Sequence, residues 1–151
     1  MRKALTLFFL LSAACAGRPD IHVAENADLQ GYKRFAVVPY SEEEGLGREY
    51  AEAMGKALYA LGRDIVPLEH VTAAFNEIGI KEGDELGLYN MLEIQKLTRA
   101  DAVLFGSVHC SAMGKKQTTV LLLSTRGGDP LFRSEFRHEN CGTREGAVSA
   151  A

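Results

Sequence analysis

The stretch Ala102-Val103-Leu104-Phe105-Gly106-Ser107-Val108 decides the fold of this chain of 151 residues. It is an uninterrupted run of apolar and small residues of strand length, which is typical of a buried strand. An earlier run, Arg34-Phe35-Ala36-Val37-Val38-Pro39-Tyr40, has the same character and stops at a proline, which cannot continue a ladder of hydrogen bonds. We therefore expect a sheet built around strands at 34–40 and 102–108.

The segment between these two runs has the periodicity of helices. A first helix ends at Gly62, a second ends at Gly79, and a third, which Asp84 can cap, runs through Leu88, Met91, Leu92 and Leu97. A short apolar strand, 64–67, lies between the first two helices. The order strand, helix, strand, helix, helix, strand predicts parallel strands joined by right-handed crossovers.

The last part of the domain has the pattern of an antiparallel hairpin. A β-rich run, 118–125, is followed by a turn at 126–130 that contains two glycines, and 131–137 alternates between two faces. The expected fold class is α/β, with a mixed five-stranded sheet of parallel strands plus a C-terminal β-hairpin and with helices packed on it.

The first fifteen residues have the layout of an export signal. Arg2 and Lys3 precede a short apolar core, 4–11, which is too short to span a bilayer comfortably. Small residues then lead directly to Cys15 and resemble the lipobox of bacterial lipoproteins. This resemblance implies cleavage after residue 14 and lipidation of Cys15; an ordinary signal peptide with a chance cysteine is the alternative.

These features divide the chain into four parts. The signal peptide is 1–14, the lipidated cysteine and a flexible tether are 15–31, the α/β domain is 32–138, and a disordered tail is 139–151. The tether is polar and without a period, and a flexible chain of this length reaches about 20–25 Å. The domain is therefore expected to stay close to its membrane.

The charge of the chain argues against two classes of partner. Without its signal peptide the chain has five more acidic than basic residues, and Ser41 to Glu85 alone holds 11 acidic and 4 basic residues. Such a surface repels nucleic acid and anionic phospholipid. We therefore expect no nucleic-acid partner, and contact with the membrane only through the N-terminal lipid.

Two motifs resemble the superfamily of bacterial periplasmic lipoproteins that includes CsgG, LpoB and the N-terminal domain of TolB. One is 34–40 with its following helix and 62–67, and the other is 97–108 followed by a hairpin. Arg99 stands where the superfamily has glycine, and Tyr40 stands where it has phenylalanine. The resemblance covers about Tyr32 to Arg137 and implies an anticodon-binding-domain-like sandwich in which the 118–125 strand runs antiparallel to the rest.

The motif residues have structural tasks. Pro39 ends its strand, and Asp101 can accept hydrogen bonds in the turn that enters the next strand. Gly106 lets a helix or a neighbouring chain approach the sheet. No catalytic group is among them, so the resemblance implies a binding scaffold without a cofactor.

Four residues form the one metal-like set in the sequence: His109, Cys110, His138 and Cys141. They follow two strands that are expected to run parallel, which brings both pairs to one edge of the sheet. Two cysteines and two histidines suit zinc, but the adjacent residues 109 and 110 point to opposite faces of a strand. A Cys110–Cys141 disulfide, two free thiols and a zinc site therefore stay open, with no metal in the leading interpretation.

Two further patterns lack what an enzyme needs. Gly45-Leu46-Gly47 follows three glutamates and lacks the remaining residues of a phosphate-binding loop. Ser107 and His109 share one face, but neither a nucleophile elbow nor an orienting acid accompanies them. We therefore predict no catalytic residue.

The sequence thus predicts a lipid-anchored, periplasm-facing and non-enzymatic protein of the outer membrane. Its expected role is that of an adaptor in cell-envelope assembly or regulation, with another envelope protein or a homo-oligomer as partner. Ala16 supports the outer membrane, because an acidic residue at this position is the expected inner-membrane retention signal. A component of an outer-membrane secretion or transport assembly is the alternative, and a metal-binding protein or an enzyme comes third.

Overall fold

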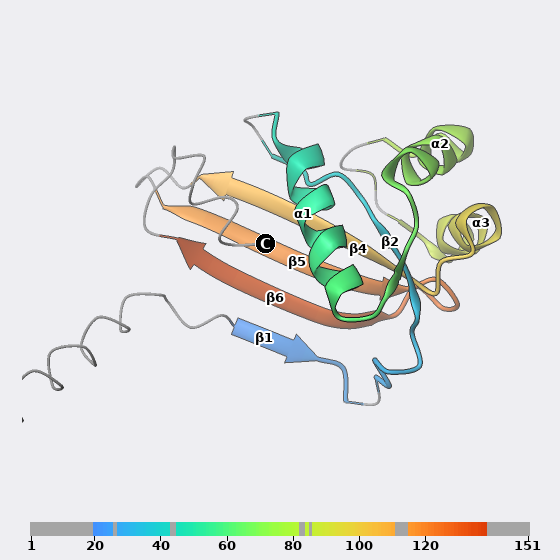
Figure 1. Cartoon of the computed structure of the whole chain (residues 1–151), viewed down its shortest axis with the longest axis horizontal. Helices are drawn as coiled ribbons and strands as arrows, with labels where there is room; N and C mark the ends of the chain where they lie inside the picture. The colour runs from blue at the N-terminus through green and yellow to red at the C-terminus, as the bar shows by residue number, and fades with distance from the viewer. Residues whose placement is uncertain are drawn as a thin grey trace, which may run out of the picture.

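The computed structural model describes residues 20–25, 27–42, 45–81, 84, 86–110 and 115–138. The signal peptide, Cys15 and the 139–151 tail lie outside these residues. The described part folds into one mixed sheet with helices on both faces (Figure 1). Its elements are β1 Asp20–Val23, β2 Arg34–Val37, α1 Gly47–Ala60, β3 Asp64–Ile65, α2 Leu68–Ile78, α3 Leu88–Thr98, β4 Ala102–Cys110, β5 Lys116–Ser124 and β6 Pro130–His138.

The sheet has the strand order β1-β6-β5-β4-β2-β3. Strand β2 pairs in parallel with both β3 and β4, and β5 pairs antiparallel with β4 and β6. The parallel core follows from the chain between its strands, since α1 separates β2 from β3 and two helices separate β3 from β4. The predicted mixed sheet, with parallel strands and a C-terminal hairpin, is confirmed.

The predicted number of five strands is wrong for the described residues, because β1 adds a sixth. It pairs antiparallel with β6 and lies inside the segment that the sequence predicts as a flexible tether. The strand has only four residues, and its apolar side chains, Ile21 and Val23, remain about half exposed, at 53% and 50%. This segment forms a strand because it pairs with the open edge of β6. The sequence around residues 20–23 does not indicate that such an edge is available.

Each face of the sheet is covered by different helices (Figure 1). Phe35 and Val37 of β2 pack with Tyr50 and Ala51 on α1, whereas the intervening Ala36 packs in a second core with α2 and α3. Successive residues of a strand point to opposite faces, so the continuous apolar run of β2 is buried on both sides. Among the described residues, no helix has the length and the apolar character that crossing a membrane requires.

Two details of the helices differ from the sequence prediction. Gly87, not Asp84, is the N-cap of α3, and its N–H donates to Asn90 Oδ1 at 3.1 Å. Asp84 instead accepts a hydrogen bond from the Lys81 N–H at 2.7 Å within the preceding loop. Helix α1 ends at Ala60, two residues before Gly62, and its C-cap Leu61 is 75% exposed.

Candidate functional site

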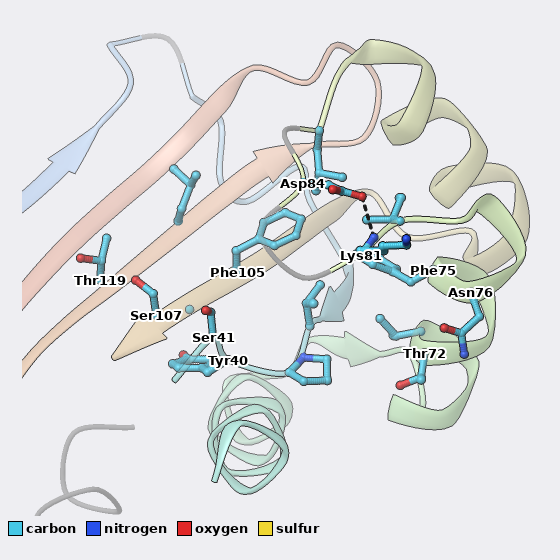
Figure 2. A pocket seen from close by; sticks show the side chains of 17 residues that line it. Tyr40, Ser41, Thr72, Phe75, Asn76, Lys81, Asp84, Phe105, Ser107 and Thr119 are labelled. Carbon is cyan, nitrogen blue, oxygen red and sulfur yellow. Dashed lines mark hydrogen bonds between the residues drawn. The ribbon is translucent and has the colours of Figure 1, made fainter. Parts of the chain in front are cut away.

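An apolar cleft of about 610 Å³ lies between α2 and the sheet. Its floor is formed by β4 and β5, and the Val38–Ser41 segment and the loop after α2 close its sides. Figure 2 shows Phe105 on β4 and Phe75 on α2, which both line the cleft; their ring centroids are 6.4 Å apart. A mostly apolar hollow of this size is typical of a binding site.

The cleft exists because the helices do not extend over the whole sheet. Along β5, buried residues alternate with half-buried ones, and the half-buried Thr119 and Leu121 line the cleft. Helices α2 and α3 form a core with β2 and β4 that Leu123 of β5 also joins, whereas Thr119 and Leu121, on the same face of β5, line the cleft. Half-buried apolar side chains are thus left around an open hollow.

The polar groups of the cleft are suited to binding. Hydroxyl and amide side chains line it from two elements: Thr72 and Asn76 on the wall formed by α2, and Ser107 and Thr119 on the strands of the floor. Ser107 lines the cleft, whereas His109 is exposed towards the end of β4. The arrangement offers hydrogen bonds to a bound molecule.

The ring of Tyr40 packs directly against the backbone of Gly106. A Cβ atom at position 106 would stand 2.2 Å from the Tyr40 ring, so only glycine leaves room for it. The same ring stacks on Tyr50, with 5.6 Å between centroids. The Tyr40 hydroxyl is buried and has no hydrogen-bond partner among the described residues, and burial raises its pKa far above the ordinary value. Pro39 lies two residues after the end of β2 and lines the cleft.

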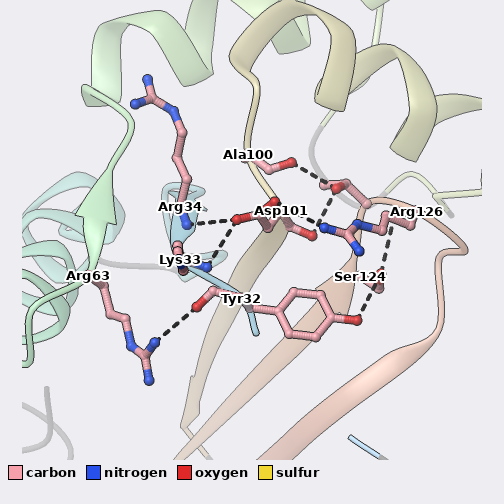
Figure 3. Close-up of polar contacts among 9 residues, drawn as sticks. Tyr32, Lys33, Arg34, Arg63, Ala100, Asp101, Ser124 and Arg126 are labelled. Atoms are coloured by element: carbon pink, nitrogen blue, oxygen red, sulfur yellow. Dashed lines mark hydrogen bonds and ion pairs between the residues drawn. The ribbon is translucent and has the colours of Figure 1, made fainter. Parts of the chain in front are cut away.

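Asp101 joins three segments at one end of the sheet (Figure 3). Its Oδ2 accepts hydrogen bonds from the N–H groups of Lys33 and Arg34, each at 3.0 Å, and its Oδ1 lies 3.7 Å from the Arg126 guanidinium. Burial by itself raises the pKa of this carboxyl. The backbone hydrogen bonds and the arginine outweigh burial, so the pKa of Asp101 lies below its ordinary value. The residue connects the starts of β2 and β4 to the turn after β5.

The predicted His/Cys set lies at the opposite end of the sheet. Cys110 and His138 both pair with Lys116 of β5, so the ends of β4 and β6 do meet at one edge. Cys110 is disulfide-bonded, but Cys141 lies outside the described residues, and the pairing of the two stays a prediction. Within the described ranges, no group of three His, Cys, Asp or Glu side chains is placed to hold a metal ion.

The cleft was not among the features expected from the sequence. Its apolar residues, among them Phe75, Phe105 and Leu121, were expected only as parts of a core or strand. The one signal was Val120-Leu121-Leu122-Leu123, which does not alternate and so indicates an apolar partner on both faces of the strand. Whether that partner is a helix or an open hollow depends on how far the helices reach.

The architecture is that of a mixed α/β domain with an LpoB-like fold, although the sequence matches no protein-family profile and no curated protein. Lipoprotein GNA1162 from Neisseria meningitidis is similar over 78% of this chain and 88% of its own, with a TM-score of 0.58 and 16% identity. The LpoB C-terminal domain from Salmonella enterica is similar over 72% and 83%, with a TM-score of 0.55 and 18% identity.

A third solved structure is the PelC dodecamer from Paraburkholderia phytofirmans. It is similar over 87% of this chain and 91% of its own, with a TM-score of 0.56 and 16% identity. At these identities the likeness concerns the fold. The relation to CsgG and TolB, and the classification as an anticodon-binding-domain-like sandwich, remain predictions from the sequence motifs.

Proposed function

We propose that this chain is a lipid-anchored adaptor that binds another protein of the bacterial cell envelope and has no enzymatic activity. The observation that carries this proposal is the open apolar cleft of about 610 Å³, with hydroxyl and amide groups along its sides. The LpoB-like fold supports it, because a similar solved structure is a lipoprotein by name. Regulation of envelope assembly is the role that fits such an adaptor best.

The proposed location is the periplasmic side of the outer membrane. The export signal and the small residues before Cys15 support lipidation of this cysteine, and Ala16 supports the outer membrane. A disulfide between Cys110 and Cys141 fits the same oxidising compartment. The adaptor would then be held close to its membrane, with its cleft available to a periplasmic partner.

The test is to extract the lipidated full-length protein in mild detergent and to measure its mass by light scattering on a sizing column. We expect one copy of this chain with one other protein in the peak, which mass spectrometry then identifies. Thr119→Lys, which places a charge in the cleft, should release that protein. Gln117→Lys, on the same strand but outside the cleft lining, is the matched control. A monomer without any partner would contradict the proposal.

A subunit of a homo-oligomeric secretion or transport assembly is the second candidate. Two exposed apolar patches favour it: Leu88 and Tyr89 on α3, which are 53% and 72% exposed, and Tyr59 and Leu61 at the end of α1, which are 73% and 75% exposed. The two helices pack on opposite faces of the sheet. Two different patches support a head-to-tail contact, which closes into rings, and PelC was solved as a dodecamer. A mass several times that of this chain, with no other protein present, would favour this candidate.

A further inference from the structure

Strand β1 lies close in the sequence to the proposed lipid anchor. Only residues 16–19 separate Cys15 from Asp20, the first residue of β1. Because an extended chain spans at most about 3.3–3.6 Å per residue, the start of β1 lies within about 18 Å of a lipidated Cys15. The pairing of β1 with β6 therefore shortens the expected tether from 15–31 to these few residues.

Strand β1 forms the outer edge of the sheet, beside β6 (Figure 1). Val23 is paired with Phe132, which packs against the core that α1 covers. Directly opposite residues of an antiparallel pair share one face of the sheet. Ile21 shares this face with Val23, because the side chains of a strand alternate. Both side chains are about half exposed, so this face of the edge presents apolar surface beside α1.

The two faces of this edge differ in charge. On the face that carries α1, the segments 20–23 and 131–137 place no ionisable side chain. The opposite face holds those of both strands, namely Asp20, His22, Arg133, Glu135 and Arg137. Glu25 and Asp28 follow in the loop after β1, further along the chain from Cys15. The edge is thus apolar on one face and charged on the other.

We propose that the apolar face of β1, formed by Ile21 and Val23, contacts the headgroup region of the membrane that holds Cys15. The short tether keeps this face at a high effective concentration near the bilayer, so weak partitioning of two aliphatic side chains is sufficient. The cleft lies on the face of the sheet that carries α2, so it turns away from the bilayer towards a periplasmic partner. This inference rests on the proposed lipidation of Cys15 and adds a membrane contact made by the folded domain.

Dyes on β1 test the inference. Ile21→Cys and Val23→Cys are each labelled with an environment-sensitive dye in the lipidated full-length protein. Each is placed in phosphatidylcholine nanodiscs with or without a lipid that carries a spin label on its headgroup. His22→Cys is the matched control, because residue 22 lies between the two test positions and its side chain, 70% exposed, is on the opposite face. The unsubstituted protein, taken through the same labelling, gives the background.

We expect the spin-labelled lipid to quench the dyes at positions 21 and 23 at least about 2-fold more strongly than the dye at 22. The emission at 21 and 23 should also shift to shorter wavelength in the nanodisc. Insertion of about 20 glycine and serine residues between Arg18 and Pro19 lowers the effective concentration, so the difference in quenching should shrink.

The outcomes distinguish this inference from the proposed function. Equal quenching at all three positions, or quenching at none, would overturn the contact through this face and leave the lipid anchor standing. A shifted emission that persists in the Cys15→Ala protein without nanodiscs would assign the face to a second copy of the chain instead of the membrane. Mass spectrometry of the purified protein decides lipidation separately, and an unmodified Cys15 would refute the anchored location itself.

Discussion

Replacement of Asp101 by alanine should destabilise the domain by about 3 kcal/mol. The carboxylate accepts two hydrogen bonds from backbone N–H groups, those of Lys33 and Arg34, and the substitution leaves both donors without this acceptor. A hydrogen bond to a charged group contributes about 1.5–3 kcal/mol in a protein. The Asp101 side chain is 25% exposed, so water replaces part of what is lost, and the low end of that range applies to each bond.

Asp101→Asn separates charge from geometry. The asparagine keeps an oxygen that can accept from the same N–H groups but loses the attraction to Arg126, so we expect a loss of about 1–2 kcal/mol. The chain has no tryptophan, so urea unfolding is best followed by circular dichroism. For the alanine variant the melting temperature should fall by about 10 °C.

The pH dependence gives an independent check. The pKa of Asp101 is lower in the folded protein than its ordinary value of about 3.9. A carboxyl with a depressed pKa contributes stability above its unfolded pKa and loses it as the pH falls through the folded pKa. The difference in unfolding free energy between the wild type and Asp101→Asn should therefore be largest at neutral pH and shrink below about pH 4.

The matched control is Glu77→Ala on the exposed surface of α2. This substitution removes a carboxylate from a solvent-exposed helix position, so we expect a change within about 0.5 kcal/mol. If Asp101→Ala were no more destabilising than this control, the carboxylate would not be what joins β2 to β4. A pH-independent difference between the wild type and Asp101→Asn would likewise refute the electrostatic reasoning.

Three further predictions concern single positions. Gly106→Ala places a Cβ atom 2.2 Å from the Tyr40 ring and should cost about 1–3 kcal/mol in urea unfolding; unchanged stability would show that the ring moves freely. Tyr40→Phe removes a buried hydroxyl that has no partner in the described part of the chain and should stabilise by up to about 1 kcal/mol, whereas a clear loss of stability would reveal a partner outside that part. Cys15→Ala should move the exported protein from the membrane fraction to the soluble fraction; an unchanged distribution would refute lipid anchoring.

The central elements were predictable because their signals are local. The apolar run 34–40 contains β2 and ends with a proline, and 102–108 lies within β4. Gly79 ends α2 in the left-handed conformation, as its position after the last apolar residue predicted. Each signal depends on residues within one element, so no knowledge of packing is needed to interpret it.

The remaining features depend on residues far apart in the sequence. Strand β1 exists because β6 offers an edge more than a hundred residues later, and its own four residues carry little information. Gly106 contacts the ring of Tyr40, a residue far away in the sequence. This contact is the reason why position 106 needs a glycine, and no local pattern around position 106 indicates it. Phe105 and Leu121 have the local pattern of core residues, and only the packing of α2 and α3 shows that both line an open cleft.

The sequence by itself determined the order and type of the central elements, the parallel core with its terminal hairpin, and the acidic character of the 41–85 segment. Periodicity, turn residues and charge are properties of the amino-acid sequence and are the same in the folded and the unfolded chain. Only the tertiary structure decided the sixth strand, the task of Asp101 in joining three segments, and the apolar cleft. These depend on which surfaces meet and which stay uncovered, and the packing of whole elements sets that outcome.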